Sequence, residues 1–467
     1  MKYLCKMDDY FNYNVDRPLE ENYTPEQYEK VLEAEDYCLK LGDKTFTTDG
    51  SIIYLDLELK FIESYNGKIS LSIQSASNIF YDYYILYEVH HSSLKVLSIS
   101  KDFHIVSDKI KEGKTYYVEA LYKQCENYYI IRSVSAFTKC KLTKVKHKGD
   151  EVTVCIPVYN GEIFLPRTLD TILSGKFDKF RIVIVNDGSK DNTKDVLDWY
   201  SKKYPFIKAI NNENRGVTYT RNECLYHANT PYMAFIDADD MISYNMLQRL
   251  YDVIVETDSD VSLCKSIVRD DLDTDSLVLN VQCDNYKLYS YEDMARESSH
   301  CSWDNIYFVA LWNKIVRTSV AKKVRFPVNK YYEDSAYTPA MYSFADKFVF
   351  VKDAAYVWDK RKRITYGTYT NVYFEKDFYD TIRYFFDATV YPIYNGNRNN
   401  IEFVKYQAIK DLINYVDEIK GCKPDVKRTY RNKFRQLLLS TNIKNNRYFN
   451  EDKEIYNKVI NYIYGRI

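Results

Sequence analysis

The chain has 467 residues, with 65 lysines and arginines against 66 aspartates and glutamates, 46% hydrophobic residues and 48 tyrosines. This length is sufficient for two or three domains. A formal net charge of -1 gives the molecule no overall positive potential to attract a polyanion, so we expect no nucleic-acid partner. With only 13 glycines and 10 prolines but 16% aromatic residues, collagen-like, low-complexity and disordered chains are excluded as well.

The cysteines and the absence of long apolar runs bear on location. Ten cysteines lie singly between Cys5 and Cys422 without a CxxC pair, and no basic and apolar leader follows Met1. We therefore expect free, packed thiols in a reducing, cytoplasmic setting. No run approaches the roughly 18 apolar residues of a membrane span, so any membrane contact would be peripheral. The basic stretch Lys420–Arg435 indicates a solvated helix face, or else a site for an anionic acceptor or the inner membrane surface.

The first 148 residues are predicted to form an antiparallel β domain, most simply a β-sandwich. Asn66-Gly67 is a typical hairpin turn, and Thr24 followed by Pro25 predicts a helix over Pro25–Leu39. Three segments alternate apolar and polar residues as half-buried strands do: Ser51–Leu59, Lys68–Ile73 and Thr115–Leu121.

Tyrosines are concentrated in this β region, at Tyr81–Tyr87 and Tyr128–Tyr129. A ring that carries a hydroxyl suits both a half-buried strand and the face of a sugar. Packing within the β domain is the simpler interpretation of these clusters, and a glycan-binding surface is the alternative.

From residue 150 to about 370 the pattern changes to short apolar runs, each followed by a helical segment. The runs are Val152–Ile156, Arg181–Val185, Ile207–Ile210 and Tyr232–Ile236. This alternation predicts an α/β domain with a Rossmann-like, mainly parallel sheet. Residues 371–467 are predicted as a C-terminal helical region with helices near Val372–Val390, Asn399–Ile419, Lys427–Leu439 and Glu451–Tyr464.

Polar residues follow three of these runs, where an open α/β sheet has its binding crevice. The first run ends at Pro157-Val158-Tyr159-Asn160, the second at Asn186-Asp187-Gly188-Ser189, and the fourth at Asp237-Ala238-Asp239-Asp240. An aromatic ring, a carboxylate at a glycine turn and a carboxylate cluster suit a nucleotide with a diphosphate that binds Mg²⁺ or Mn²⁺.

Each of these signals has a simpler interpretation. Asp187-Gly188-Ser189 is also an ordinary turn and helix cap, and Asp-x-Asp recurs in the acidic segment Asp270–Asp275, which we interpret as a solvated loop. The cluster at Asp237 and Asp239 differs by its place after a buried strand, because carboxylates packed there repel one another unless a cation compensates them.

Further motifs follow along the chain: Asn214-Arg215-Gly216, Thr220-Arg221-Asn222, Trp312-Asn313-Lys314-Ile315, Arg325-Phe326-Pro327 and Tyr332-Glu333-Asp334. In this order, together with the strand ends, residues 151–345 resemble a family 2 glycosyltransferase with the GT-A fold, of the kind that builds bacterial cell-surface polysaccharides. The resemblance covers under half of the chain and leaves out the N-terminal β domain and the C-terminal helices.

The resemblance implies a role for each motif residue in binding a nucleotide-sugar donor. Pro157, Tyr159, Asp187 and Arg221 would bind the nucleotide, Asp237 would contact the ribose or the sugar, Asp239 would ligate Mn²⁺ or Mg²⁺, and Asp240 would support them. A divalent cation is needed because the departing diphosphate carries negative charge.

The resemblance also implies that Asp334 is the catalytic base, with Glu333 in support. The acceptor hydroxyl is a poor nucleophile until a carboxylate takes its proton, and one base with direct attack implies inversion. Glu333-Asp334 is equally a favourable helix start. Arg361 and Arg363 lie where the family often has a diphosphate-binding loop; the alternative is a solvated charge run.

We therefore predict a metal-dependent inverting glycosyltransferase that moves a sugar, most simply from a UDP-sugar, to a glycan or glycoconjugate hydroxyl in polysaccharide biosynthesis. A nucleotidyltransferase would have a glycine-rich basic loop after its first strand, which Tyr159-Asn160-Gly161-Glu162 lacks. A binding scaffold without catalysis would not need Asp237, Asp239 and Asp334. A homo-oligomer is a further expectation, but the sequence contains no coiled-coil heptads that would indicate how its subunits associate.

Overall fold

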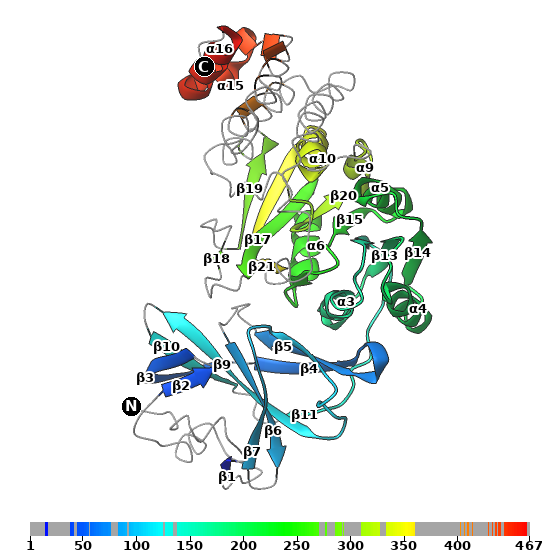
Figure 1. The fold of residues 1–467 in the computed structure, drawn as a ribbon, viewed down its shortest axis with the longest axis vertical. Helices are drawn as coiled ribbons and strands as arrows, with labels where there is room; N and C mark the ends of the chain where they lie inside the picture. Colours follow the sequence, from blue (N-terminus) through cyan, green and yellow to red (C-terminus); the bar gives the residue numbers. More distant parts are fainter. Residues whose placement is uncertain are drawn as a thin grey trace. The chain divides into compact units, whose positions relative to one another are not determined.

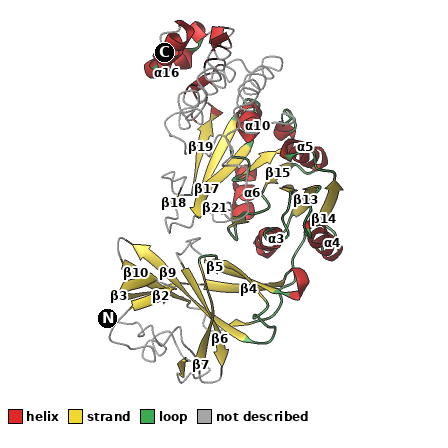
Figure 2. Cartoon of the chain, viewed as in Figure 1, coloured by secondary structure: helices red, strands yellow, loops and turns green. Residues whose placement is uncertain are grey.

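The protein divides into two compact units, drawn in Figures 1 and 2. Unit 1 comprises Met1–His147, Glu162–Asp178 and Met241–Met246, and unit 2 comprises Lys148–Gly161, Lys179–Asp240 and Leu247–Ile467. The computed structural model describes residues 15–16, 38–41, 44–55, 57–75, 83–90, 93–124, 127–133, 138–269, 276–277, 285–291, 293, 310–326, 333–359 and 443–464, with single residues between 402 and 439. The first change of unit falls beside the boundary expected at residue 148, whereas the boundary expected at 370–371 lies outside these ranges.

Unit 1 is built mainly from two sheets. Its strands are β1 (Val15–Asp16), β2 (Cys38–Leu41), β3 (Lys44–Leu55), β4 (Leu57–Glu63), β5 (Ile69–Ser75), β6 (Tyr83–His90), β7 (Ser93–Ser100), β8 (His104–Ser107), β9 (Thr115–Gln124), β10 (Asn127–Ser133) and β11 (Thr138–Lys139). The larger sheet has the order β1-β7-β6-β9-β10-β3-β2, with β11 paired to β9, and the smaller has the order β4-β5-β8. Phe61 and Tyr116 pack between the sheets, with ring centroids 5.7 Å apart.

The hairpin predicted at Asn66-Gly67 is confirmed. Strands β4 and β5 pair antiparallel from Leu57 opposite Ser75 to Glu63 opposite Ile69. Asn66 and Gly67 have φ angles of 58° and 70°, which is the left-handed conformation that a tight hairpin turn favours.

The expectation of purely antiparallel pairing is wrong for one pair of the described strands. Strands β3 and β10 pair in parallel, with Ile52 opposite Ile130. Parallel pairing needs a long connection, and strands β4 to β9 supply it, so local alternation could not reveal the direction. The helix predicted over Pro25–Leu39 is wrong at its end, because Cys38 and Leu39 pair with β3 as part of β2; its earlier residues lie outside the described chain.

The tyrosines of β6 pack within the sheet. Tyr83, Tyr84 and Tyr87 are all buried, and β6 lies between β7 and β9. Since neighbouring residues of a strand point to opposite faces, both faces of β6 are covered. For these three rings the packing interpretation is confirmed, while the side chains of Tyr128 and Tyr129 lie outside the described set.

Helix α3 (Leu165–Ser174) belongs to unit 1, although it follows the first strand of the α/β region along the chain. Lys60 Nζ of β4 donates to the carbonyl of Ser174 at 2.6 Å. Arg167 Nη1 donates to Asp102 Oδ2 at 3.3 Å. The first helix predicted for the α/β domain is therefore bound to the strands of unit 1, the β-rich unit. The short strand β16 (Met241–Ile242) also belongs to unit 1.

A buried histidine lies beneath this helix. His104 Nε2 and Ser70 Oγ share a hydrogen bond of 2.6 Å, and Asp170 Oδ2 of α3 lies 4.0 Å from the same nitrogen. Burial, and next the charge of Arg167, lower the pKa of His104 to about 3, although Asp102 opposes the shift. The imidazole is therefore neutral at physiological pH, and its contact with Asp170 is not an ion pair.

Unit 2 contains a mixed sheet with helices packed on it, coloured from green to yellow in Figure 1. Its strands are β12 (Val152–Val158), β13 (Phe180–Asp187), β14 (Ile207–Asn212), β15 (Tyr232–Phe235), β17 (Val261–Arg269), β18 (Ser276–Leu277), β19 (Tyr286–Ser290), β20 (Lys314–Arg317) and β21 (Lys347–Asp359). Its helices include α4 (Thr193–Lys203), α5 (Val217–His227), α6 (Met246–Glu256), α9 (Thr318–Ala321) and α10 (Glu333–Tyr342).

The predicted parallel strands are confirmed in one half of this sheet. Strands β14, β13, β12 and β15 are successive parallel neighbours, with α5 against β12 and β13 and α4 against β13 and β14. Strand β20 then runs antiparallel between β15 and β17, and β17 pairs in parallel with β21. The carboxyl ends of β12, β13 and β15 consequently lie at one edge, where the polar strand ends were found.

One hydrophobic core joins this sheet to the C-terminal helices α15 (Arg447–Glu451) and α16 (Lys453–Tyr464), which follow the short helix η5 (Ile443–Asn445). Phe348 of β21 shares this core with Phe449 and Val459, so these helices belong to the core of the α/β unit. The helix predicted over Glu451–Tyr464 is confirmed by α16. The one predicted over 372–390 lies outside the described residues, and only single residues of 399–419 and 427–439 are described.

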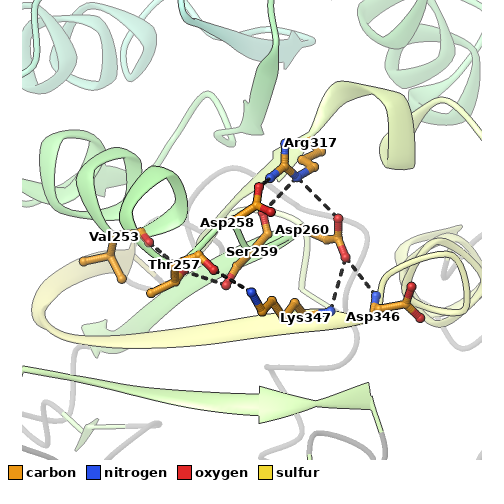
Figure 3. A network of polar contacts seen from close by, with 8 residues as sticks. All are labelled: Val253, Thr257, Asp258, Ser259, Asp260, Arg317, Asp346 and Lys347. Carbon is orange, nitrogen blue, oxygen red and sulfur yellow. Dashed lines mark hydrogen bonds and ion pairs between the residues drawn. The ribbon is translucent and has the colours of Figure 1, made fainter.

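A polar network secures the turn between α6 and β17, shown in Figure 3. Arg317 Nη2 donates to Asp258, and Arg317 Nε lies 3.4 Å from Asp260 Oδ1. Asp260 Oδ2 accepts from the backbone N–H groups of Asp346 and Lys347 at 2.8 and 3.2 Å. Since Arg317 pairs with Tyr232 at the start of β15, this network lies at the other end of that strand from its polar carboxyl end.

Two observations bear on the expectations about location. Cys140, Cys155, Cys224 and Cys264 are buried free thiols, as predicted for these four residues. Burial raises the pKa of Cys264 to about 12, so this thiol is unreactive. Across the described ranges, we find no helix with the length and apolar character needed to cross a membrane.

We predict that His104 makes the stability of unit 1 sensitive to acid. Its folded pKa lies below its ordinary value, so between about pH 6.5 and 3 the unfolded chain binds a proton that the folded chain refuses, and stability falls as pH drops through that window. Urea unfolding at pH 7 and pH 5 should show that His104→Gln removes about 2 kcal/mol of this pH dependence. The exposed His147 supplies the control, and equal pH dependence in His104→Gln and His147→Gln would contradict the prediction.

Candidate active site

The end of β12 presents an aromatic ring on an ordered loop. Tyr159 is 38% exposed, and Asn160 follows it with φ of 52°. The Asn160 N–H donates to Ser189 Oγ at 2.9 Å, and Asn160 Oδ1 accepts from the Lys190 N–H at 2.9 Å. The Gly161 N–H donates to Thr193 Oγ1 at 2.8 Å. The loops after β12 and β13 are thus joined, with the ring of Tyr159 open to a ligand.

Asp187, at the end of β13, organises the loop before α5. Its Oδ1 accepts from the Arg215 N–H at 2.7 Å, and its Oδ2 accepts from the Gly216 N–H at 2.9 Å. The side chain is only 5% exposed. Asp187 therefore holds the loop before α5 in place, and the helix-cap interpretation left open by the sequence is not what its contacts show. Each oxygen retains a lone pair for a ligand.

Gly188 is required by the close approach of two loops. It has φ of 66°, and a Cβ on this residue would lie 2.5 Å from the backbone nitrogen of Asn214. The neighbouring Asn186 accepts from the Ser189 N–H at 3.1 Å and donates to Asn211 Oδ1 at 2.9 Å. Glycine at this position thus permits the contact that brings the Asp187 carboxylate to its two N–H donors.

The acidic turn Asp237–Asp240 follows β15 directly. The buried Ile236 donates its N–H to Cys155 O of β12 at 3.0 Å, and the Asp240 N–H donates to Asp237 O at 3.2 Å. Asp237 and Asp239 are half-buried, and Asp240 is buried. The three carboxylates therefore lie in one tight turn at the carboxyl edge of the sheet, as predicted.

Tyr356 of β21 braces this turn. Its hydroxyl donates to Asp240 Oδ2 at 2.7 Å and accepts from the Asp237 N–H at 3.2 Å. The Asp359 N–H donates to Asp240 Oδ1 at 2.9 Å, and Trp312 stacks on the Tyr356 ring with centroids 4.3 Å apart. Burial, followed by repulsion from Asp239 and Asp237, raises the pKa of Asp240 well above its usual range.

These contacts limit which carboxylates could hold a metal. Asp240 is unsuited, because it is only 1% exposed and its two oxygens face the Tyr356 hydroxyl and the Asp359 N–H inside the fold. Among the residues that the structure describes, no group of three or more His, Cys, Asp or Glu is arranged to bind a metal ion. Asp239, with Asp237 beside it, therefore fits a cation only if a bound ligand supplies further oxygens, as a diphosphate does.

Arg221 connects the acidic turn with helix α10. It extends from α5, is 7% exposed, and donates from Nη1 to Glu333 Oε1. Its Nη2 donates to Asp237 Oδ1 at 3.3 Å. The structure thus places the guanidinium, which the resemblance assigned to the nucleotide, between two carboxylates of the site.

Helix α10 begins with the predicted Glu333-Asp334 pair, Glu333 buried and Asp334 half-buried in its first turn. Nearby, the buried Lys314 of β20 donates to Asn313 Oδ1 at 2.6 Å and to the carbonyl of Ala310. Burial lowers the pKa of Lys314 to about 7, while the neighbouring Cys264 and Asp334 oppose that shift. Lys314 is thus within electrostatic reach of Asp334.

The structure brings several predicted residues together and leaves others apart. Asp237, Arg221 and Glu333 form one connected group, and Asp239, Asp240 and Asp334 adjoin it in the chain. Pro157 is buried within β12, opposite Val185. Arg361 and Arg363 lie outside the described residues. Sequence reasoning missed Tyr356 and gave Trp312 and Lys314 no individual role; Tyr356 lies in a strand without a motif, so no local signal marks it.

Gly188→Ala should be strongly destabilising. The added Cβ meets backbone rather than a flexible side chain, so we expect a loss of at least about 2 kcal/mol from the clash and the positive φ together. Gly113 has φ of 83° and open space around it, so Gly113→Ala should lose only about 1 kcal/mol. Urea unfolding of both variants checks this, and equal losses would show that the loop approach is unimportant.

Tyr356→Phe should loosen the acidic turn without unfolding the protein. The phenyl ring keeps the stacking on Trp312 but loses both hydroxyl contacts, so the midpoint of a Mn²⁺ titration in the presence of UDP should rise by about tenfold. Tyr337→Phe is the control, since that buried hydroxyl donates to Ala321 O at 2.7 Å instead. Equal midpoints in the two variants would argue against the brace.

Comparison with known proteins connects this geometry to a family. Residues 153–324 match the model of glycosyl transferase family 2. Glycosyltransferase GlyA of Streptococcus pneumoniae is 26% identical over 236 residues, which are 49% of this chain and 32% of GlyA. The poly(ribitol-phosphate) beta-glucosyltransferase of Bacillus spizizenii is 33% identical over 119 residues, 25% of this chain and 19% of that protein. The chain thus covers less than a third of the length of either relative.

A solved structure shares the fold. The crystal structure of S. aureus TarS 1-349 in complex with UDP-GlcNAc has a TM-score of 0.50 and 21% sequence identity, and the match covers 63% of this chain and 82% of that one. At this identity the likeness concerns the fold alone, which is that of a GT-A protein. Over residues 153–324, the chain is similar to the glycosyl transferase family 2 proteins.

Proposed function

We propose that the protein transfers a sugar from a nucleotide diphosphate donor, most simply a UDP-sugar, to a hydroxyl of a glycan or glycoconjugate, with inversion at the anomeric carbon. One observation carries the proposal. Arg221 contacts both Asp237 of the acidic turn and Glu333, the neighbour of Asp334. These contacts support one site that holds the carboxylates expected on the donor side and on the acceptor side.

The nucleotide would bind at the ends of β12 and β13. The exposed ring of Tyr159 offers a face for the nucleobase, and Asp187 has lone pairs left to accept from a base N–H. Because the TarS fragment was solved in complex with UDP-GlcNAc, that compound is the first donor to test.

The diphosphate would lie over the acidic turn. Asp239 would hold Mn²⁺ or Mg²⁺ with Asp237 beside it, and a bound cation would neutralise the negative charge that the diphosphate gains as it leaves. Asp240 orients the turn through its contacts with Tyr356 and the Asp359 N–H. Arg221 keeps Asp237 in place from the helix side.

Asp334 would act as the base on the acceptor side. Its carboxylate would take the proton of the acceptor hydroxyl as that oxygen forms a bond to the anomeric carbon, while the bond from that carbon to the diphosphate oxygen breaks. Attack on the face opposite the leaving group inverts the configuration. The first turn of α10 suits a carboxylate, because the helix dipole favours negative charge there.

The acceptor is proposed as a carbohydrate-containing polymer or its precursor at the cell surface. The Bacillus spizizenii relative is named for poly(ribitol-phosphate), so a polyol-phosphate polymer should be tested beside oligosaccharides. The four buried free thiols support a reducing, cytoplasmic site of action, and we propose contact with the inner membrane face only through the acceptor.

A donor screen tests the function directly. Purified protein is heated with a panel of nucleotide sugars, with and without Mn²⁺, because a ligand that binds only the folded state raises the melting temperature. Donors that stabilise the protein are then incubated with the acceptor panel, and the product is analysed for its anomeric configuration. A retained configuration would overturn the assignment of Asp334 as the only base, and binding without turnover would favour a scaffold.

Asp334→Asn should abolish transfer but leave donor binding intact. The amide keeps the size of the side chain and cannot take a proton, so we expect kcat to fall by about a thousandfold or more, with the donor-induced rise in melting temperature unchanged. Asp346→Asn, at an exposed carboxylate of the same unit, is the control. Equal loss of binding and transfer in Asp334→Asn would show that Asp334 is structural.

A further inference from the structure

Arg221 is occupied by the protein itself. Its Nη1 donates to Glu333 and its Nη2 to Asp237 Oδ1 at 3.3 Å, and only 7% of the residue is exposed. The two carboxylates, Asp237 and Glu333, follow Arg221 by 16 and 112 residues in the sequence. A guanidinium group carries its N–H donors in a planar fork, so it can donate hydrogen bonds to two carboxylates at once. Little of the Arg221 surface is therefore exposed to a nucleotide.

An aromatic stack attaches the same helix to Arg221. The guanidinium carbon lies 5.9 Å from the centre of the Phe326 ring, and Phe326 stacks on Tyr337 of α10 with centroids 3.9 Å apart and an angle of 12°. Asn222, next to Arg221, donates to Phe326 O at 2.8 Å and accepts from the Phe326 N–H at 2.9 Å. Phe326 is thereby fixed to α5.

Glu333 and Tyr337 are four residues apart on α10, so both lie on the same face of that helix. This face is tied to α5 in two ways, directly through the ion pair with Arg221 and indirectly through the stack on Phe326, which Asn222 of α5 holds. The first turn of α10, including Asp334, is consequently held against α5 by a cation and two rings. The acidic turn is held by the same cation through Asp237.

We propose that Arg221 and Glu333 are a positioning pair that sets the distance between the acidic turn and Asp334. The proposal rests on the proposed function, in which Asp237 lies on the donor side and Asp334 takes the acceptor proton. It assigns Arg221 to the catalytic step rather than to nucleotide affinity, because the residue acts on the relative placement of two groups that react in the transition state.

Charge explains why an arginine is needed. Glu333 is buried and Asp237 is half-buried, and two carboxylates near each other in a medium of low dielectric repel strongly unless a cation lies between them. A lysine supplies the charge at a single point and cannot fork toward both acceptors. Arg221→Lys should therefore retain one contact and release the other, which moves α10 relative to the acidic turn.

The test compares Arg221→Lys, Glu333→Gln and the double variant in steady-state kinetics with the donor and acceptor found by the screen. Each single variant should lower kcat by roughly 10- to 100-fold, as a small misplacement of reacting groups does, with the donor KM within about threefold of the parent. The double variant should lose no more than the worse single variant, because the pair acts as one unit. Arg317→Lys, in the network of Figure 3, is the matched control and should leave both constants unchanged.

The opposite pattern overturns the proposal. If Arg221→Lys raises the donor KM by more than tenfold and leaves kcat unchanged, Arg221 binds the nucleotide. If the losses in the double variant multiply, the two residues act independently and are not a pair.

Hydrogen exchange separates this proposal from the proposed function. In Arg221→Lys, the backbone amides of the first turns of α10 should exchange faster while those of α5 stay protected, and this readout needs no turnover. If no donor is used by the parent protein, the proposed function fails, and exchange still decides whether Arg221 holds α10. Unchanged exchange in α10 would overturn the positioning role.

Discussion

The concentration of carboxylates at the end of one buried strand is the electrostatic constraint on which the site depends. Asp237, Asp239 and Asp240 follow β15 without a break, and Glu333 is drawn to the same place by Arg221. Each ionised carboxylate makes its neighbours harder to ionise. The fold compensates with one buried guanidinium and with the hydroxyl of Tyr356, and each of these two groups also connects the acidic turn to another element.

The contacts of helix α3 explain the unusual division of the chain into two units. After β12 and Tyr159 the chain enters α3, which belongs to the β-rich unit and is held there by Lys60 and Arg167. A Rossmann-like sheet requires a helix after its first strand, and here that helix has its polar partners in residues before 148. The segment 162–178 is therefore part of unit 1, although it follows β12 along the chain.

Much of this could be predicted from local patterns. The four apolar runs became β12 to β15, the Asn66-Gly67 turn formed its hairpin, and the acidic turn follows β15. Such features depend on neighbours within a few residues, which periodicity and turn chemistry report. Three features could not be predicted: the parallel pairing of β3 with β10, the assignment of α3 to unit 1, and the contact of Tyr356 with the acidic turn. In each case the partners lie far apart in the sequence and no motif marks them.

By itself, the sequence indicated the resemblance to glycosyl transferase family 2, the order of the strand ends and the types of side chain available at them, since each of these is encoded in short segments. Only the tertiary structure decided how those side chains are used. Arg221 faces Glu333 and Asp237, Asp187 holds the loop before α5, and the surplus tyrosines of β6 are buried. The reason is physical: a buried charge, an N–H group or an aromatic face is satisfied by whichever partner the folded chain brings near, and that proximity is not written in sequence spacing.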